Sequence, residues 1–124
     1  MKFRVVDRRI CDFIDYGSIG RKISKGKTYI IKNNDIGYKV YYKQMSPLEY
    51  IHRCANMMGI SVERLIESRQ DDSLKQLQHN INSGNYGIIY IDESNKMQDG
   101  LHRAIILMMK KVPKINVLVI EKIK

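Results

Sequence analysis

The chain of 124 residues suits one domain with a single hydrophobic core, and its 44% hydrophobic and 28% charged residues exclude an intrinsically disordered protein. No apolar run approaches the roughly 20 residues of a membrane-spanning helix, and the N-terminus lacks the apolar segment of a signal peptide, so we expect a cytoplasmic protein without a membrane partner. The net charge of +9 favours an anionic partner, such as a nucleotide, a nucleic acid or a phosphorylated substrate, although charge that only maintains solubility explains it equally well.

Most of the positive charge lies in residues 1–45, which carry eleven Lys or Arg and four Asp or Glu. Two β-branched and aromatic runs, Lys27–Lys32 and Tyr38–Lys43, flank the turn-forming sequence NNDIG and predict a β-hairpin. Before the hairpin, DYGSIGRKISKGK at residues 15–27 predicts a flexible, basic, glycine-rich loop. This loop lacks the spacing and the final Lys-Ser/Thr of a P-loop, so it is a weak phosphate signal.

The sequence SPLEYIHRCANMMG predicts a helix with recognisable ends. Ser46 suits the N-cap, Pro47 suits the first helical position, Glu49 completes a capping box and Gly59 suits the C-terminal end. Cys54 is expected to be a core residue rather than a nucleophile, and the absence of a Cys-x-x-Cys pair excludes a zinc ribbon. Apolar residues at helical spacing predict a buried face formed by Leu48, Ile51, Cys54, Ala55 and Met58.

The rest of the chain alternates helical and strand patterns. Helices are predicted to follow Ser61 and Ser73, because each serine is a good N-cap. A strand pair, a helix and a final strand are then predicted at residues 87–92, 96–100, 101–111 and 115–121. We expect the first and last of these strands to be buried and close together. The fold class is therefore α+β, a single small domain with a mixed sheet.

The turn Asp99-Gly100-Leu101-His102-Arg103 precedes the last predicted helix and combines residues that suit a phosphate group. Glycine lets the backbone approach a ligand closely, and the first turn of a helix offers unpaired N–H groups at its positive end. His102 and Arg103 add donors, while Asp99 is suited to hold a divalent cation or to accept a proton. Without other information, an Asp99 that caps the helix beside two solvated side chains is the favoured interpretation.

Residues 88–120 resemble the ParB/sulfiredoxin-like superfamily, in which a short strand pair leads into a Gly-x-His/Arg-Arg turn, a helix and a strand. Residues 65–84 are similar to the helix that precedes this strand pair, so the resemblance covers about half of the chain. Residues 1–45 have no counterpart in that family. They are expected to form a β-rich basic extension to a phosphate-binding domain at residues 46–124, where they would complete the sheet, cover a nucleotide or bind a partner.

In this superfamily the box binds nucleotide phosphates, and an acid before the glycine is typical of the free serine kinase-like branch. The resemblance implies ATP, ADP or CTP as the nucleotide, with Mg²⁺ held by Asp99, and it assigns catalysis to Asp99 and Glu67. Leu101 stands where sulfiredoxin has its cysteine, so reduction of a sulfinic acid is not expected. The residues expected to contact phosphate are Gly100, His102, Arg103 and Arg69.

Three functions remain open, and the sequence does not decide whether the protein is an enzyme. The first is a small phosphotransferase or nucleotide hydrolase, and the second is a module that binds or senses a nucleotide without chemistry. The third is a DNA- or RNA-binding protein or nuclease that uses a basic and aromatic ribbon of the hairpin. That ribbon comprises Tyr29, Tyr38, Tyr41, Tyr42, Lys27, Lys39 and Lys43, although hairpin aromatics are more often core pairs. Arg103 itself is interpreted as a phosphate ligand, a solvated residue or a buried partner of Asp99.

Overall fold

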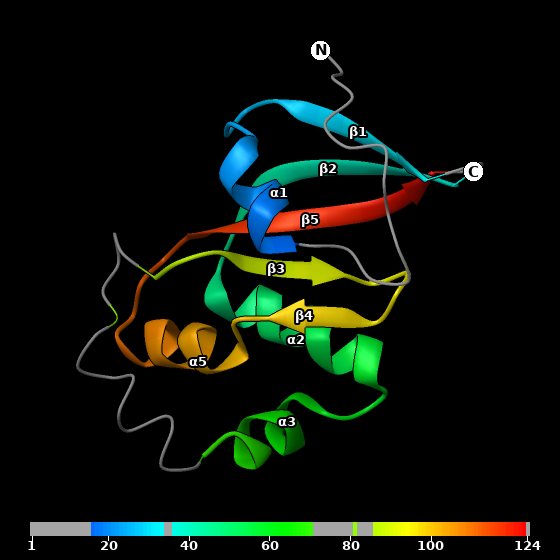
Figure 1. Cartoon of the computed structure of the whole chain (residues 1–124). Helices are drawn as coiled ribbons and strands as arrows, with labels where there is room; N and C mark the ends of the chain where they lie inside the picture. The colour runs from blue at the N-terminus through cyan, green and yellow to red at the C-terminus, as the bar shows by residue number, and fades with distance from the viewer. Residues whose placement is uncertain (1–15, 34–35, 71–80, 82–85, 124) are drawn as a thin grey trace.

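The computed structural model describes residues 16–33, 36–70, 81 and 86–123 (Figure 1). In chain order the described elements are α1 (Tyr16–Lys22), β1 (Thr28–Asn33), β2 (Ile36–Met45), α2 (Pro47–Met58), α3 (Val62–Ser68), β3 (Ile89–Asp92), β4 (Met97–Asp99), α5 (Leu101–Met109) and β5 (Ile115–Ile123). The helix predicted after Ser73 lies outside the described residues. The protein is a small α+β domain built on one sheet, which confirms the predicted fold class at that level.

The five strands lie in the order β1-β2-β5-β3-β4, with β5 in the centre (Figure 1). β5 is antiparallel to β2, from the pair Gly37↔Ile123 to the pair Met45↔Ile115, and parallel to β3. The sheet is therefore mixed. The two strands predicted to be buried neighbours are β3 and β5, and that prediction is confirmed.

β1 and β2 form the predicted antiparallel hairpin, in which Thr28 is paired with Tyr41. β2 continues to Met45, two residues past the predicted end, because β5 pairs with it along its length. The hairpin therefore supplies two of the five strands, and it completes the sheet rather than standing apart from it.

Residues 16–22 of the predicted loop form a helix, α1, so the prediction is wrong for this part, whereas residues 23–27 form a turn without helix or strand. Tyr16, Ile19 and Ile23 recur at helical spacing, and all three are buried against the sheet. A Cβ atom at Gly20 would lie 2.9 Å from Ile88 Cδ1, so this glycine permits close packing. Contacts between α1 and the sheet therefore override the low helix propensity of its glycines.

The sheet has two buried faces of different character. Figure 1 shows α1 in front of the sheet and α2 behind it. The face covered by α2 and α5, here called the aliphatic face, contains Met45, Ile89, Ile91, Ile115, Val117 and Val119. The face covered by α1, here called the tyrosine face, contains Tyr16, Ile19, Ile23, Tyr29, Ile31, Tyr38, Val40, Leu118 and Ile120.

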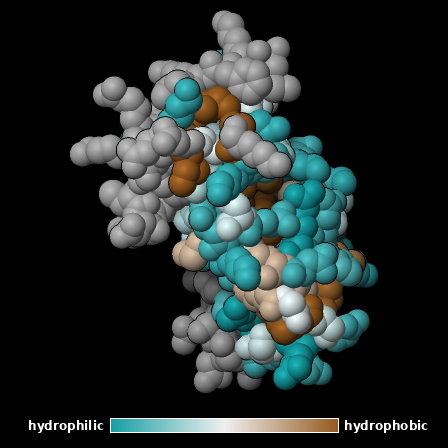
Figure 2. Space-filling model, turned by 90° about the vertical axis from the view of Figure 1, so that its right-hand side faces the viewer, coloured by the Kyte–Doolittle hydropathy of each residue, from teal (hydrophilic) through white to brown (hydrophobic). Residues whose placement is uncertain are grey.

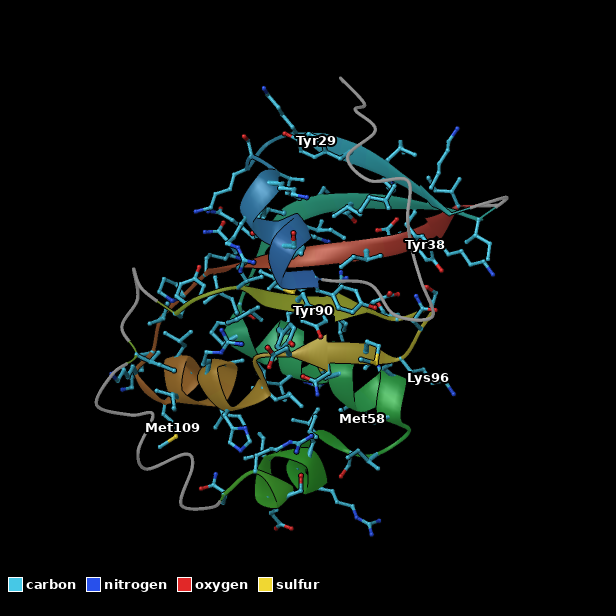
Figure 3. The ribbon with its side chains drawn as sticks, viewed as in Figure 1. Tyr29, Tyr38, Met58, Tyr90, Lys96 and Met109 are labelled. Carbon is cyan, nitrogen blue, oxygen red and sulfur yellow. The ribbon has the colours of Figure 1, made fainter. Side chains whose placement is uncertain are left out.

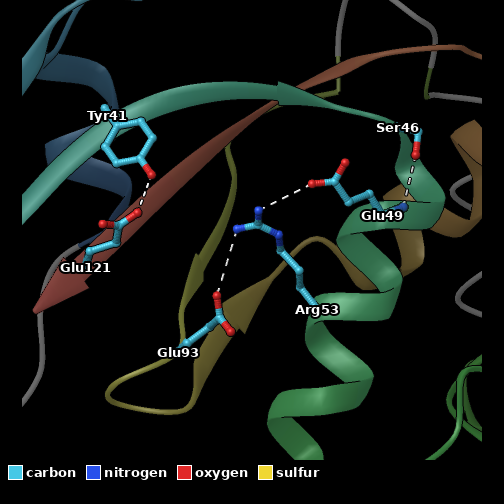
Figure 4. A network of polar contacts seen from close by, with 6 residues as sticks. All are labelled: Tyr41, Ser46, Glu49, Arg53, Glu93 and Glu121. Atoms are coloured by element: carbon cyan, nitrogen blue, oxygen red, sulfur yellow. Dashed lines mark hydrogen bonds and ion pairs between the residues drawn. The ribbon is translucent and has the colours of Figure 1, made fainter.

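The ends of α2 agree with prediction, but its buried face does not. Ser46 accepts a hydrogen bond from the backbone N–H of Glu49 at 3.1 Å, and Gly59 ends the helix in the left-handed region. The carboxylate of Glu49 pairs with Arg53, which also pairs with Glu93 (Figure 4). The buried residues are Pro47, Tyr50, Ile51, Cys54 and Ala55.

Leu48 and Met58, which were predicted to be buried, are 43% and 37% exposed. The buried face is turned toward Tyr50, whose aromatic ring fills the core while its hydroxyl finds hydrogen-bond partners in the backbone. The large apolar side chains that are exposed among the described residues are Ile36, Leu48, Met58, Met97 and Met109. They come from separate elements, and Figure 2 shows apolar side chains scattered among hydrophilic ones on the face it presents.

Candidate functional site

A pocket of about 260 Å³ lies where β4 ends and α5 begins. Its lining residues are Arg69, Gln98, Asp99, Gly100, Leu101, His102 and Arg103. The sequence-predicted box therefore lines one cavity, and Arg69, which follows α3, joins it from a distant part of the chain. Glu67 is exposed on α3 and is not among the lining residues, so the structure does not bring it together with the box.

Gly100 shapes the mouth of the pocket. It is the N-cap of α5 with φ 118°, a backbone conformation that favours glycine. A Cβ atom at this position would lie 2.8 Å from Ile89 Cγ1, so packing against β3 also requires glycine. The interpretation of Asp99 as a helix cap is wrong, because the N-cap is Gly100 and no side chain caps α5.

The start of α5 has backbone N–H donors that no side chain caps. The first hydrogen bond within the helix is donated by the backbone N–H of Ala104 to the carbonyl oxygen of Gly100, at 2.8 Å. The N–H groups of residues 101–103 therefore make no bond within the helix, and they lie at the positive end of its dipole. Such a helix start is a common binding site for phosphate and carboxylate groups.

Arg103 is held in place by two contacts. Its Nη2 atom lies 3.3 Å from Asp99 Oδ2, and its Nη1 atom donates to the carbonyl oxygen of Tyr86 at 2.8 Å. Gly87 leaves room for the guanidinium, since a Cβ there would lie 2.8 Å from Nη1. The Arg103 side chain is only 20% exposed, so the interpretation of a solvated residue is wrong. A guanidinium has five N–H donors, and these contacts leave some of them for a ligand.

Two buried polar atoms of the pocket residues lack hydrogen bonds. Within the described part of the chain, Arg69 Nε and Gln98 Oε1 are shielded from solvent and have no partner. Leaving such a group unsatisfied costs about 1–3 kcal/mol, and native proteins rarely do so without a reason. A ligand that brings both acceptors and donors to this pocket is a sufficient reason. Sequence reasoning included Arg69 but missed Gln98.

Tyr50 positions the strand end that carries the box, and the sequence analysis missed it. The side chain is fully buried, and its hydroxyl lies 2.8 Å from the carbonyl oxygen of Tyr90 and 3.0 Å from that of Asp99. Burial raises the pKa of this hydroxyl well above its ordinary value, so it stays protonated and keeps donating. Tyr50 thus fixes α2 to β3 and β4 one residue before Gly100. Its position on α2 beside Ile51 was the available signal.

Cys54 lies one turn further along α2 and takes no part in the pocket lining. It is fully buried, and burial raises the pKa of its thiol to about 12. A thiol that stays protonated at neutral pH is a poor nucleophile. The prediction that Cys54 is a core residue is therefore confirmed.

A second group of buried polar atoms lies on the tyrosine face, around Asp92. This residue is completely buried, and its carboxylate accepts hydrogen bonds from Tyr16 Oη (2.7 Å), Ser94 Oγ (2.8 Å) and both the backbone N–H and the Nδ2 of Asn95. The ring of Tyr16 also stacks on Tyr90 at a centroid distance of 4.1 Å. Asp92 therefore has a complete set of partners and needs no ligand.

The predicted basic and aromatic ribbon does not form one exposed surface. Tyr29 and Tyr38 are 4% and 6% exposed, and both belong to the tyrosine face (Figure 3). Tyr42 donates a hydrogen bond to the carbonyl oxygen of Gly20 beneath α1. Tyr41 lies on the opposite face and bonds to Glu121 (Figure 4). Tyr29 and Tyr38 are therefore core residues, as the alternative interpretation had it, whereas Tyr41 and Tyr42 are only partly buried.

Comparisons with protein-family models, with curated proteins and with solved structures found no match. Within the described residues no three His, Cys, Asp or Glu side chains are grouped so that they could hold a metal ion. None of the described helices is long and apolar enough to cross a membrane.

Proposed function

We propose that this protein binds the phosphate group of a nucleotide, or of another phosphorylated small molecule, in the pocket at the start of α5. The observation that carries the proposal is the meeting of Arg69, Arg103 and the uncapped first turn of α5 in one cavity. These are three independent sources of positive potential. Only one acid, Asp99, lines the same cavity, and it is already paired with Arg103.

The size of the pocket agrees with a ligand that is only partly enclosed. Pockets that bury most of a drug-sized molecule hold about 300–1,000 Å³, whereas this one holds about 260 Å³. It therefore suits one or two phosphate groups, while the rest of the ligand would lie against the surrounding surface. The ParB/sulfiredoxin-like resemblance supports a nucleotide, with ATP, ADP and CTP as the first candidates to test.

Phosphoryl transfer or hydrolysis is the catalytic form of this proposal. Asp99 supports it, because its carboxylate lines the pocket and is 66% exposed, where an attacking hydroxyl has access. Mg²⁺ commonly binds through one or two carboxylates together with phosphate oxygens, so Asp99 would hold it when a nucleotide is present. The non-catalytic form keeps the same phosphate contacts and forms no product.

Calorimetry with inorganic phosphate, ATP, ADP and CTP tests binding, with Arg69→Met as the decisive variant. A charge-assisted hydrogen bond contributes about 1.5–3 kcal/mol, so the variant should bind at least about tenfold more weakly. Its stability should not fall, because the change removes a buried donor that has no partner. Arg64→Met is the matched control, since Arg64 lies exposed on α3 away from the pocket lining.

Unchanged affinity in Arg69→Met would contradict the proposal, and a clear loss of stability would instead make Arg69 a structural residue. Product analysis with each nucleotide and Mg²⁺ then separates the two forms. If the wild-type protein forms product and Asp99→Asn does not, the catalytic form is supported. Tight binding without product supports a binding module. Because the carboxamide is close in size to the carboxylate, this variant keeps the shape of the pocket.

A further inference from the structure

A cluster of positive charge lies between residues 16 and 33. The sequence from Tyr16 to Asn33 contains no Asp or Glu. Five cations of this segment are exposed, and none forms an ion pair with any residue that the structure describes. Lys32 lies within β1, and the other four, here called the cationic turn, are Arg21, Lys22, Lys25 and Lys27. They occupy the end of α1 and the connection to β1.

The backbone of the cationic turn is fixed at several points. Ile23 is 7% exposed and anchors the middle of the segment in the tyrosine face. The backbone N–H of Ser24 donates to the hydroxyl of Tyr29 at 3.2 Å, and Tyr42 donates to the carbonyl oxygen of Gly20 at 2.7 Å. Because these anchors turn the apolar side chains inward, the four cations are directed outward from a defined frame.

The residues around the cationic turn indicate which kind of polyanion it suits. A protein that binds a membrane surface usually inserts apolar side chains beside its cations, but none of the exposed large hydrophobic residues lies between Tyr16 and Asn33. Proteins that bind single strands stack bases on exposed aromatic rings, but Tyr29 is buried and Tyr42 is bonded beneath α1. Contacts with a phosphate backbone need only cations.

We propose that the cationic turn binds the phosphate backbone of double-stranded nucleic acid without reading its sequence. This surface is separate from the pocket at α5 and does not depend on the proposed function of that pocket. Four phosphate contacts predict that the logarithm of affinity falls with the logarithm of salt concentration with a slope of about −3.6. A fourfold rise in salt should then weaken binding by roughly 100-fold.

Fluorescence anisotropy with labelled DNA and RNA duplexes of about two helical turns tests this inference. The variant replaces all four residues of the cationic turn by glutamine: R21Q, K22Q, K25Q and K27Q. The charge-matched control replaces four exposed lysines outside the cationic turn: K32Q, K43Q, K114Q and K122Q. The control should keep most of the affinity and the slope, whereas the variant should lose the salt dependence almost entirely. Binding of inorganic phosphate at α5 should be equal in both.

Three results would overturn the inference. Absence of wild-type binding to both duplexes at low salt would exclude double-stranded nucleic acid as the ligand. Equal losses in the variant and the control would mean that total charge, and not this turn, drives association. Tighter binding to single strands, or selective binding to vesicles of phosphatidylserine and phosphatidylcholine, would assign the turn to another kind of partner. Matching melting temperatures of both proteins establish that neither set of substitutions disturbs the fold.

Discussion

Asp92 and the α5 pocket are two places where polar groups are removed from water, and they are treated in opposite ways. Both oxygens of Asp92 are saturated by hydrogen bonds from Tyr16, Ser94 and Asn95. In the pocket, Arg69 Nε and Gln98 Oε1 have no partner among the described residues. Saturated polar groups stabilise a fold, whereas unsaturated ones destabilise it until a ligand arrives. The same rule thus separates a structural cluster from a candidate binding site.

The largest effect is expected where the saturated cluster is broken. Asp92→Ala leaves the buried hydroxyl of Tyr16 without its acceptor and removes the acceptor of the Asn95 amide, so unfolding free energy should fall by about 3–4 kcal/mol. Urea denaturation measures the loss. Asp99→Ala is the control, because its carboxylate is mostly exposed and its pair with Arg103 should contribute no more than about 1 kcal/mol. Equal losses would remove the distinction between the two regions.

Gly100→Ala tests the backbone of the pocket. The substitution forces a side chain onto φ 118° and brings its Cβ within 2.8 Å of Ile89, so the expected loss of stability is about 2–3 kcal/mol. Gly26→Ala shares a positive φ of 84° but has open space around it, and it should lose only about 1 kcal/mol. Thermal unfolding of both variants gives the difference. A loss at Gly100 no greater than that at Gly26 would show that close packing against β3 is unimportant.

Tyr50→Phe tests a saturated hydrogen bond at the edge of the pocket. The hydroxyl of Tyr50 lies within hydrogen-bond distance of backbone carbonyl groups, whereas polar groups of the pocket itself have no partner among the described residues. The change deprives the carbonyl groups of Tyr90 and Asp99 of their donor, and should lower stability by about 1–2 kcal/mol. Phosphate affinity should fall with it, since Gly100 follows directly. Tyr41→Phe, which loses an exposed bond to Glu121, should stay within about 0.5 kcal/mol. An unaffected stability in Tyr50→Phe would contradict the positioning role.

The smallest effect concerns Cys54, a buried group that is neither saturated like Asp92 nor open like the pocket. Burial raises the pKa of its thiol from 9.0 to about 12. The folded state therefore favours the protonated thiol, and the stability that comes from this preference is complete below pH 9 and is lost as the pH rises toward 12. At pH 8 the folded thiol should react with an aromatic disulfide roughly a thousandfold more slowly than the urea-unfolded one. The measurement uses Cys11→Ser protein, so that Cys54 is the only thiol of the chain. Similar rates in both states would mean that Cys54 is accessible.

Local signals in the sequence were enough to predict some elements but not others. Ser46, Pro47 and Gly59 mark the ends of α2 without reference to the rest of the chain, and the hairpin likewise follows from its own residues. α1 was missed because its glycines and cations indicate a loop, and only contact with the tyrosine face makes it helical. The buried face of α2 was misassigned because hydrophobicity ranks Leu48 above Tyr50, whereas the backbone partners of the hydroxyl favour Tyr50.

The residues of the candidate site likewise differ in whether local sequence signals predict them. The box at residues 99–103 is contiguous, so its residues share the pocket whatever the rest of the fold does. Arg69 reaches them from α3, and only the resemblance to a known family suggested that it would. The position of Tyr50 beside Ile51 was a signal of its burial, but the roles of Gln98 and Tyr50 could not be predicted, because they depend on the register of β3 with β4 and on the way α2 packs behind it.

The central place of β5 also determines the order in which the protein can assemble. The β1–β2 hairpin and the β3–β4 pair contact each other in the sheet only through this strand, which spans residues 115–123. During synthesis the β1–β2 hairpin and the β3–β4 pair both leave the ribosome before β5 does. Until β5 arrives, each pair exposes an unpaired strand edge. The pairing of β2 with β5 joins residues about 80 positions apart, and pairings of this kind form slowly. Nascent chains therefore pass through an interval in which the edges of β2 and β3 are open to other strands.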